Sequence, residues 1–134
     1  FNHGTGHGVG YLLSVHEPPN AIRYRILENQ ELNPTLEQGM ITSNEPGLYL
    51  ENEFGIRIEN LILCKKAEKT SYGQFMCFEE LTMVPFDLDG VDPSQMTERE
   101  RGLLNDYHER VYQNIAPYLD KEEKEWLKAT TRKI

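Results

Sequence analysis

The sequence predicts an α+β protein in which a region of strands precedes a region of helices. Up to residue 86, short runs of alternating apolar and polar residues are separated by glycine and proline, which is typical of β-strands. From Thr97 onward the apolar residues recur at helical spacing. The segment 86–95 between these patterns is rich in turn-forming residues. We therefore expect a sheet-containing part, residues 1–86, and a second part, 87–134, made of a linker and a helical extension.

Composition indicates a soluble globular protein and excludes several partners. The chain has 134 residues, 38% hydrophobic and 27% charged, which suffices for one modest core. Its net charge of -8 argues against nucleic acid and against an anionic membrane as partners. No apolar run approaches the roughly 18 residues of a membrane span, and no secretory signal is visible. Because the chain begins at Phe1 without a methionine, we expect a fragment or a processed product.

The opening stretch, FNHGTGHGVGYLLSVHE, interleaves glycines with three of the chain's four histidines. Glycine lets the backbone approach another group closely, and a histidine between glycines is accessible to a metal. One such histidine would mean little, but three within sixteen residues indicate a site. After this loop, 11–15 is predicted to be a short buried strand, 22–27 an edge strand, and 29–38 a loop with a proline inside it.

Two glutamates stand in unlike settings in the stretch GMITSNEPGLYLENEFGIRIEN. The run Met40–Asn44 leads into Glu45, which should lie at a strand end facing a turn because the residue before a proline favours extended conformations. Alternation in 56–64, the longest strand candidate, places Arg57 and Glu59 on one face. Two carboxylates on strands, downstream of a histidine-rich loop, form a reasonable half of a metal site. Either glutamate taken singly would more often be a surface charge.

The rest of the strand region is predicted to end in a hairpin. Residues 48–53 are a loop or a short strand, 65–74 are a charged connection with a Tyr-Gly turn signal, and 75–84 return as a strand stopped by proline. Cys64 and Cys77 each fall in an expected strand and lack CxxC spacing. The simplest interpretation is a pair of half-buried reduced thiols in a cytosolic protein, and a disulfide between adjacent strands is the alternative.

Two helices are expected in the second part because the spacing of a capping box occurs twice. Thr97 with Glu100 begins the first helix, and Asp120 with Glu123 begins a shorter one after an intervening proline. His108 lies in mid-helix among packing residues, which favours a structural role over that of a metal ligand. The predicted apolar positions are Leu104, Tyr107, Val111, Ile115, Trp126 and Leu127.

Several motifs occur together and in a fixed order: HGTGHGVG, VHEPP, SNEPGLY and FGIRIEN, then ELTMVPFDLDGV and the tail LLNDYHERVYQNIAPYL. They resemble the dinuclear metallopeptidases of the pita-bread fold, and most of all the aminopeptidase P (Xaa-Pro aminopeptidase) family in its longer, cytosolic type. The resemblance covers essentially the whole chain. It implies the C-terminal half of a pita-bread catalytic domain, with a curved and mainly antiparallel sheet, followed by a helical tail.

The resemblance also implies a centre of two divalent metal ions, taken to be Mn²⁺. His7 would be the imidazole ligand of one ion, Glu45 would bind the same ion and act as the catalytic group that moves protons, and Glu59 would bridge both ions. Oxygen ligands with one imidazole suit manganese, cobalt or a similar ion better than a thiolate set would.

Three further roles follow from the same resemblance. His3 and His16 would bind the substrate and take a catalytic part by stabilising the tetrahedral intermediate, and Arg57 would hold the acidic groups in place. The implied substrate is a peptide with proline in the second position. A cytoplasmic homodimer is also implied.

One departure from the family pattern limits what these residues are expected to do alone. The resembled enzymes need two aspartate ligands upstream of HGTGHG, and every aspartate of this chain falls at Asp87 or later. One histidine and two glutamates cannot complete the shells of two metal ions. We therefore expect the 134 residues to be inactive alone, to bind metal weakly or not at all, and to need the missing N-terminal part of their own chain as a partner.

Three alternatives stay open. The chain could belong to a prolidase-type dipeptidase, although its long tail argues against this. It could be a non-catalytic pita-bread module that binds peptides or serves as a scaffold, although a module without chemistry has no reason to keep His7, Glu45 and Glu59 together. It could also be an independent acidic α+β domain with incidental histidines. Two aspartates on strands upstream would favour the enzyme.

Overall fold

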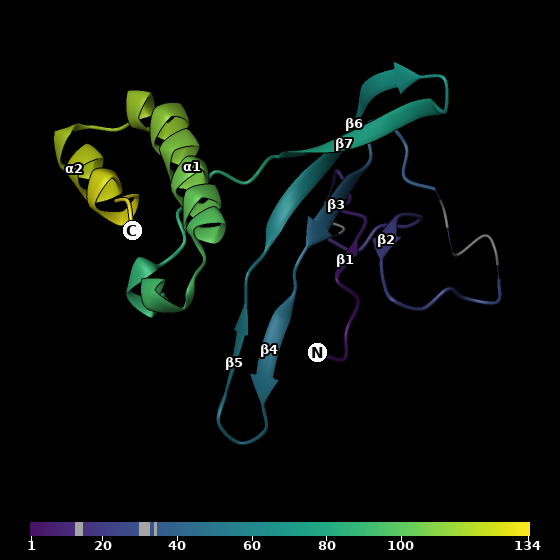
Figure 1. Ribbon diagram of the computed structural model, residues 1–134, viewed down its shortest axis with the longest axis horizontal. Helices are drawn as coiled ribbons and strands as arrows, with labels where there is room; N and C mark the ends of the chain where they lie inside the picture. Colours follow the sequence, from purple (N-terminus) through teal and green to yellow (C-terminus); the bar gives the residue numbers. More distant parts are fainter. Residues whose placement is uncertain (13–14, 30–32, 34) are drawn as a thin grey trace. The chain divides into compact units, whose positions relative to one another are not determined.

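The computed structural model describes residues 1–12, 15–29, 33 and 35–134. The chain forms two compact units, Phe1–Thr82 and Met83–Ile134 (Figure 1). All strands of the described residues lie in the first unit and both α-helices lie in the second, as expected for the predicted α+β class.

The division between the units falls a few residues before the boundary proposed from the sequence at residue 86. The reason lies in contacts made by the segment after Thr82. The carbonyl of Val84 accepts a hydrogen bond from the Tyr107 hydroxyl at 2.8 Å, and the Phe86 ring stacks on the Tyr107 ring with centroids 5.1 Å apart. This segment therefore packs with the first helix and belongs to the helical unit.

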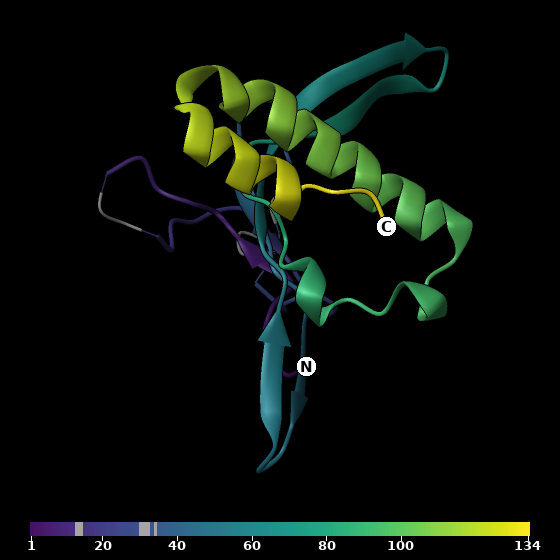
Figure 2. The ribbon, with the colours of Figure 1, turned by 90° about the vertical axis from the view of Figure 1, so that its left-hand side faces the viewer.

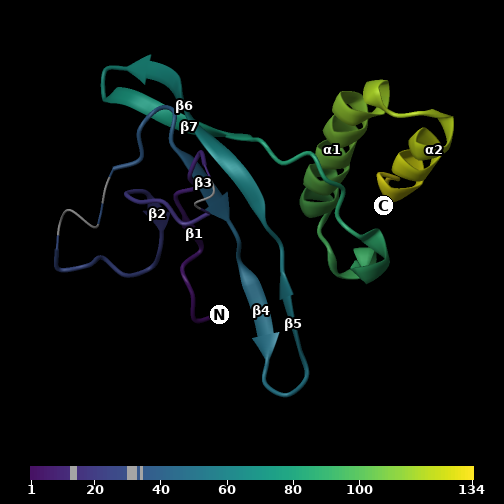
Figure 3. The same cartoon turned by 180° about the vertical axis from the view of Figure 1, so that it is seen from behind.

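Among the described residues of the first unit, all strand pairings are antiparallel, and the strands form three small sheets (Figure 3). One sheet pairs β1 with β2, the second has the order β3-β6-β7, and the third pairs β4 with β5. The strand bounds are β1 Gly6–His7, β2 Ala21–Ile22, β3 Ile41–Asn44, β4 Gly47–Leu50, β5 Phe54–Arg57, β6 Asn60–Thr70 and β7 Gly73–Glu80.

The predicted single strand over 56–64 is wrong, because the chain changes its pairing partner within it. Strand β5 pairs with β4 and ends at Arg57, whereas β6 pairs with β3 and begins at Asn60. Ile58 and Glu59 lie between the two strands. Glu59 therefore lies in the short connection between a strand of one sheet and a strand of another, rather than inside one strand.

Two shorter strand predictions are also wrong over the described residues. In place of a strand over 11–15, Tyr11 is 97% exposed and outside any strand, and residues 13 and 14 lie outside the described part. The predicted strand over 22–27 is confined to Ala21–Ile22. The physical reason is that β1 offers β2 a partner over only two residues. Residues 30–32 and 34 of the predicted loop lie outside the described part as well.

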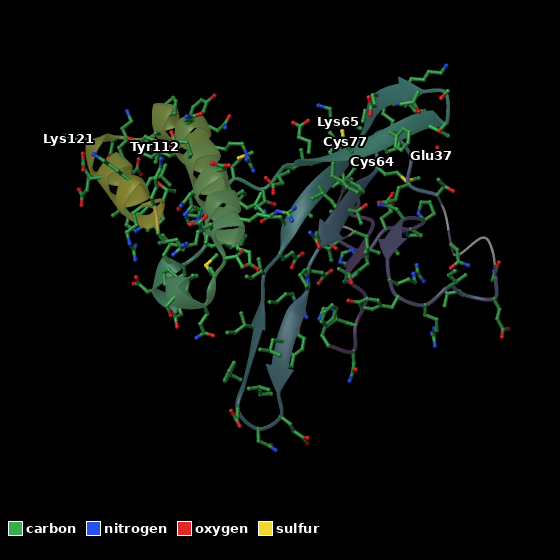
Figure 4. All side chains as sticks on the ribbon, in the orientation of Figure 1. Glu37, Cys64, Lys65, Cys77, Tyr112 and Lys121 are labelled. Carbon is green, nitrogen blue, oxygen red and sulfur yellow. The ribbon has the colours of Figure 1, made fainter. Side chains whose placement is uncertain are left out.

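The charged segment 65–74 is mostly strand rather than a connection. Strand β6 runs through this segment as far as Thr70, and β7 begins at Gly73 after a tight turn. An ion pair also links the two strands, with 2.6 Å between Nζ of Lys65 and Oε2 of Glu79. Both cysteines are free: Cys64 is buried and Cys77 is exposed (Figure 4). Since Lys65, not Cys64, lies opposite Cys77 in the register, the two thiols point to opposite faces of the sheet.

The helical unit follows the sequence closely. Helix α1 (Glu98–Ile115) and helix α2 (Lys121–Thr130) lie side by side (Figure 2), and each starts at the predicted capping box with both reciprocal hydrogen bonds present. His108 is 1% exposed, and its Nε2 accepts the Phe86 N–H at 3.0 Å, which agrees with the predicted structural role. The buried apolar core consists of Tyr107, Val111, Ala116 and Leu127.

Trp126 differs from its predicted packing role, because its side chain is 61% exposed while Leu127 beside it is 2% exposed. Successive helical residues point about 100° apart, so only one of the two can face helix α1. Neither α-helix of the described residues is both long and apolar enough to cross a membrane.

Candidate functional site

The glycine-rich loop that carries His7 is fixed alongside strand β3. The Glu45 N–H donates to the Thr5 carbonyl at 2.7 Å, and the His7 N–H donates to the Ser43 hydroxyl at 3.0 Å. A side chain at Gly6 would overlap the carbonyl oxygen of Ser43, so only glycine lets the loop approach the strand this closely. These contacts bring the histidine motif against the strand that ends at Glu45.

A buried asparagine joins the other end of this loop to the same strand. Asn20 is 7% exposed, and its amide donates to the Ile41 carbonyl at 2.9 Å and to the Thr42 hydroxyl at 2.6 Å. The backbone carbonyl of Asn20 accepts the Gly8 N–H at 2.7 Å. Because buried polar groups are costly when unpaired, these hydrogen bonds of the Asn20 side-chain amide and backbone carbonyl fix the position of the loop.

The imidazole of His7 is oriented by its own loop. Its Nδ1 lies 2.9 Å from the Gly8 carbonyl, and because a carbonyl only accepts, Nδ1 carries a hydrogen. Nε2 is then the nitrogen directed at the Glu45 carboxylate, with 3.0 Å between Nε2 and Oε1. A backbone carbonyl on one ring nitrogen is the usual second contact of a metal-binding histidine, and it leaves the other nitrogen for the ion.

Glu45 is a buried carboxylate with several partners. It is 7% exposed, and its Oε1 accepts the Ser43 hydroxyl at 2.9 Å while its Oε2 accepts Nη1 of Arg57 at 3.2 Å. A buried charge is tolerated when it is paired and hydrogen-bonded in this way. The turn after strand β3 therefore presents one fixed carboxylate beside the His7 imidazole.

Five of the six site residues predicted from the sequence line one cavity of about 520 Å³. The His16 ring lies 4.2 Å from the His7 ring, centroid to centroid. His3 is the exception: it lines a neighbouring cavity of about 560 Å³, to which His7 also contributes. The five residues in the first cavity are His7, His16, Glu45, Arg57 and Glu59.

The donors present fit part of a metal site. Ligands about 2.0–2.2 Å from one ion lie about 3 Å apart when they meet at a right angle, and His7 Nε2 and Glu45 Oε1 are 3.0 Å apart. Glu59 contributes a second carboxylate to the same cavity. Within the described residues, however, no three His, Cys, Asp or Glu side chains converge closely enough to hold an ion.

Sequence reasoning missed three residues of this site: Asn20, Ser43 and Tyr49. The Tyr49 hydroxyl accepts a hydrogen bond from Nε–H of Arg57 at 3.0 Å. This hydrogen bond, together with the electrostatic effect of the same Tyr49 side chain, raises the pKa of the Arg57 guanidinium. The pairing of Tyr49 with Gly55 places it on the face of the β4–β5 hairpin that carries Arg57. Tyr49 could have been found only by knowing that it shares a face with Arg57, and this depends on the register of the hairpin, which the sequence alone did not provide.

Comparison with known protein families identifies the class of protein. The model of metallopeptidase family M24 matches residues 1–66, and the model of the C-terminal region of peptidase_M24 matches residues 74–134. The chain therefore belongs to metallopeptidase family M24.

Individual relatives confirm the resemblance to aminopeptidase P. A probable Xaa-Pro aminopeptidase P of Coprinopsis cinerea is 44% identical over all of this chain, and that of Arthroderma otae is 45% identical over 98% of it. In each case the chain spans 22% of the relative's length. A solved X-prolyl aminopeptidase from Caenorhabditis elegans, described as a cytosolic enzyme with a di-nuclear active site, matches 98% of the chain with 36% identity and a TM-score of 0.79, over 22% of its own length. This likeness confirms the predicted fold.

Proposed function

We propose that this chain is the C-terminal part of a metal-dependent aminopeptidase that cleaves the bond between an N-terminal residue and a following proline. The observation that carries the proposal is the shared cavity, in which the His7 imidazole and the Glu45 carboxylate meet at 3.0 Å and Glu59 supplies a second carboxylate. The similarity to proteins named Xaa-Pro aminopeptidase supports the choice of substrate.

Three side chains would hold the metal centre, which we propose to contain two Mn²⁺ ions. His7, Glu45 and Glu59 supply the donors of this chain, and the remaining donors would come from the part of the protein upstream of Phe1. When bound, the ions would lower the pKa of a water molecule so that it can attack the scissile carbonyl near neutral pH.

The residues of this chain also have roles in moving protons and in stabilising charge. Glu45, held by Ser43 and Arg57, would accept a proton from the attacking water and return it to the nitrogen of the leaving proline. His16 faces the same cavity and would donate to the oxyanion that develops on the carbonyl. His3 would contact the substrate from the adjoining cavity.

An apolar hairpin face supports the upstream part of the same polypeptide as a partner. Strands β4 and β5 form a hairpin (Figure 3). Its register places four large apolar side chains on one face, and each is between 41% and 58% exposed. Contiguous apolar patches of this kind are normally covered. We propose that the upstream part covers this face in the whole protein, which we expect to be a cytoplasmic homodimer. The four residues are Leu48, Leu50, Phe54 and Ile56.

The test uses the full-length protein and a change at Glu59. Wild type is expected to release the first residue of an Xaa-Pro-Xaa tripeptide in the presence of Mn²⁺, and Glu59→Ala is expected to abolish this turnover with little loss of fold. Glu68→Ala, at an exposed position of β6, is the matched control. Near-normal turnover by Glu59→Ala would refute the bridging role.

Two further measurements separate the alternatives. Cleavage of Xaa-Pro dipeptides but not of longer peptides would indicate a prolidase-type enzyme, and peptide binding without turnover would indicate a non-catalytic module. Robust turnover by residues 1–134 alone would contradict the proposal that upstream ligands are required.

A further inference from the structure

Glu59, the proposed bridging ligand, depends on its backbone for its position. Among the described residues its carboxylate forms no hydrogen bond, whereas the carboxylate of Glu45 is held by Ser43 and Arg57. Glu59 also lies in the short connection between β5 and β6 rather than within a strand. The contacts that fix this connection therefore determine where the Glu59 carboxylate lies.

Two residues after Glu59, the main chain is held by the segment that follows β7. The Leu61 carbonyl accepts the Leu81 N–H at 2.9 Å. The Leu61 N–H donates to the hydroxyl oxygen of Thr82, also at 2.9 Å. Both polar groups of the Leu61 backbone are thus paired, and one of them is paired with a side chain.

The Thr82 hydroxyl takes a place in the sheet that a backbone carbonyl would normally have. The register pairs Ile62 with Glu80 at this end of β6 and β7, and its continuation would place Leu61 opposite Leu81. Opposite residues of an antiparallel ladder can exchange two backbone hydrogen bonds. Here the Leu81 N–H donates to Leu61, whereas the Leu61 N–H donates to Thr82. The side chain therefore completes the pairing of β6 where the chain leaves the sheet.

Thr82 also lies at the cavity that holds the site. It lines the cavity of about 520 Å³ together with Glu59 and Leu61. Since Glu59 and Leu61 are two residues apart, alternation along an extended chain directs both side chains to the same side. On the other side of Glu59, the Ile58 N–H donates to the Pro46 carbonyl at 3.2 Å. The connection that carries the glutamate is thus held at Ile58 by Pro46 and at Leu61 by Thr82.

We propose that Thr82 is a positioning residue whose hydroxyl fixes the backbone at Leu61 and thereby places the Glu59 carboxylate for the metal centre. The inference rests on the proposed function, in which Glu59 is a metal ligand. It assigns the effect to the hydroxyl and not to the bulk of the side chain. Valine has nearly the same shape as threonine but leaves the Leu61 N–H without this acceptor.

The experiment compares Thr82→Val, Thr82→Ser and the control Thr70→Val in the full-length protein. Thr70 is a matched control because its hydroxyl also accepts a backbone N–H, that of Tyr72 at 3.1 Å, but at the turn between β6 and β7. In calorimetric titration of the metal-stripped protein, Thr82→Val is expected to bind Mn²⁺ ~10–100-fold more weakly than wild type. Thr82→Ser, which keeps the hydroxyl, and Thr70→Val are expected to bind Mn²⁺ like wild type. The electron paramagnetic resonance spectrum of Thr82→Val is expected to show isolated Mn²⁺ ions where wild type shows a coupled pair.

Two results would overturn the inference. One is an unchanged Mn²⁺ affinity of Thr82→Val, with a thermal midpoint lowered only as much as in Thr70→Val, since a merely structural bond would behave in this way. The other is an equal loss of affinity in Thr82→Ser and Thr82→Val.

If the wild-type protein binds no Mn²⁺ or fails to cleave an Xaa-Pro-Xaa tripeptide, the proposed function fails. Crystal structures of the metal-free, full-length wild type and Thr82→Val then test the positioning role separately. A displaced Glu59 carboxylate in Thr82→Val would support that role, and an unmoved carboxylate would overturn it.

Discussion

Replacing Ser43 by alanine removes one hydroxyl that contacts two of the proposed metal-binding residues. Ser43 is fully buried in strand β3, where its oxygen accepts the His7 N–H at 3.0 Å and its hydrogen goes to Glu45 Oε1 at 2.9 Å. The change leaves a partly buried N–H without its partner and removes a charge-assisted bond to a buried carboxylate.

The magnitude follows from those two bonds. A buried donor left unpaired costs about 1–3 kcal/mol, and a hydrogen bond to a charged group contributes about 1.5–3 kcal/mol. With partial relaxation, we expect Ser43→Ala to lower local stability by about 2–4 kcal/mol. Because the hydroxyl orients ligands rather than binding an ion itself, we expect Mn²⁺ affinity to fall ~10–100-fold.

The assay is calorimetric titration of Mn²⁺ into the metal-stripped full-length protein, together with hydrogen exchange of the amides in β3. Ser71→Ala, at an exposed turn position, is the matched control. If Ser43→Ala binds Mn²⁺ as tightly as Ser71→Ala and exchanges at the same rate, the reasoning that Ser43 organises this site is refuted.

The remaining predictions concern the helical unit, and each is checked by hydrogen exchange of helices α1 and α2 in the full-length protein. Leu127→Ala, at a side chain that is 2% exposed, is expected to cost about 2–5 kcal/mol, whereas Leu103→Ala, at a side chain that is 61% exposed, is expected to cost less than about 0.5 kcal/mol. Thr97→Ala removes the observed cap and is expected to cost ~1 kcal/mol, with faster exchange confined to the first turn of α1. Burial, with a smaller effect of the Arg132 charge, lowers the pKa of His108 below its ordinary value of about 6.5. The unfolded state therefore binds the proton more readily, so this part of the stability is fully present above about pH 6.5 and is lost on acidification towards the lowered pKa. His108→Gln is expected to remove that part of the acid sensitivity, and an unchanged pH dependence would contradict it.

The features that the sequence predicted well depend on neighbouring residues. Each helix starts at a capping box because a threonine or aspartate and a glutamate three positions later satisfy each other's backbone groups locally. Glu45 lies at a strand end for a similarly local reason, since the following proline disfavours helix. The burial of His108 also followed from helical spacing alone.

The features that the sequence could not predict depend on distant partners. Alternation of apolar and polar residues continues through Ile58 and Glu59, although the chain leaves the β4 partner and joins β3 there. An apolar run such as 11–15 shows a preference for burial, but it does not indicate which other strand, if any, would pair with it. The contacts of Ser43 and Tyr49 with His7 and His3 join positions 36 and 46 residues apart, and no local pattern encodes them.

The most direct test of the account is anomalous diffraction from crystals of the full-length protein soaked with Mn²⁺. We predict two ions, with Nε2 of His7 and the carboxylates of Glu45 and Glu59 within about 2.0–2.3 Å of them. Two ions ligated without these three side chains, or a cavity that binds no ion at saturating Mn²⁺, would contradict the central claim that this chain supplies half of a dinuclear centre.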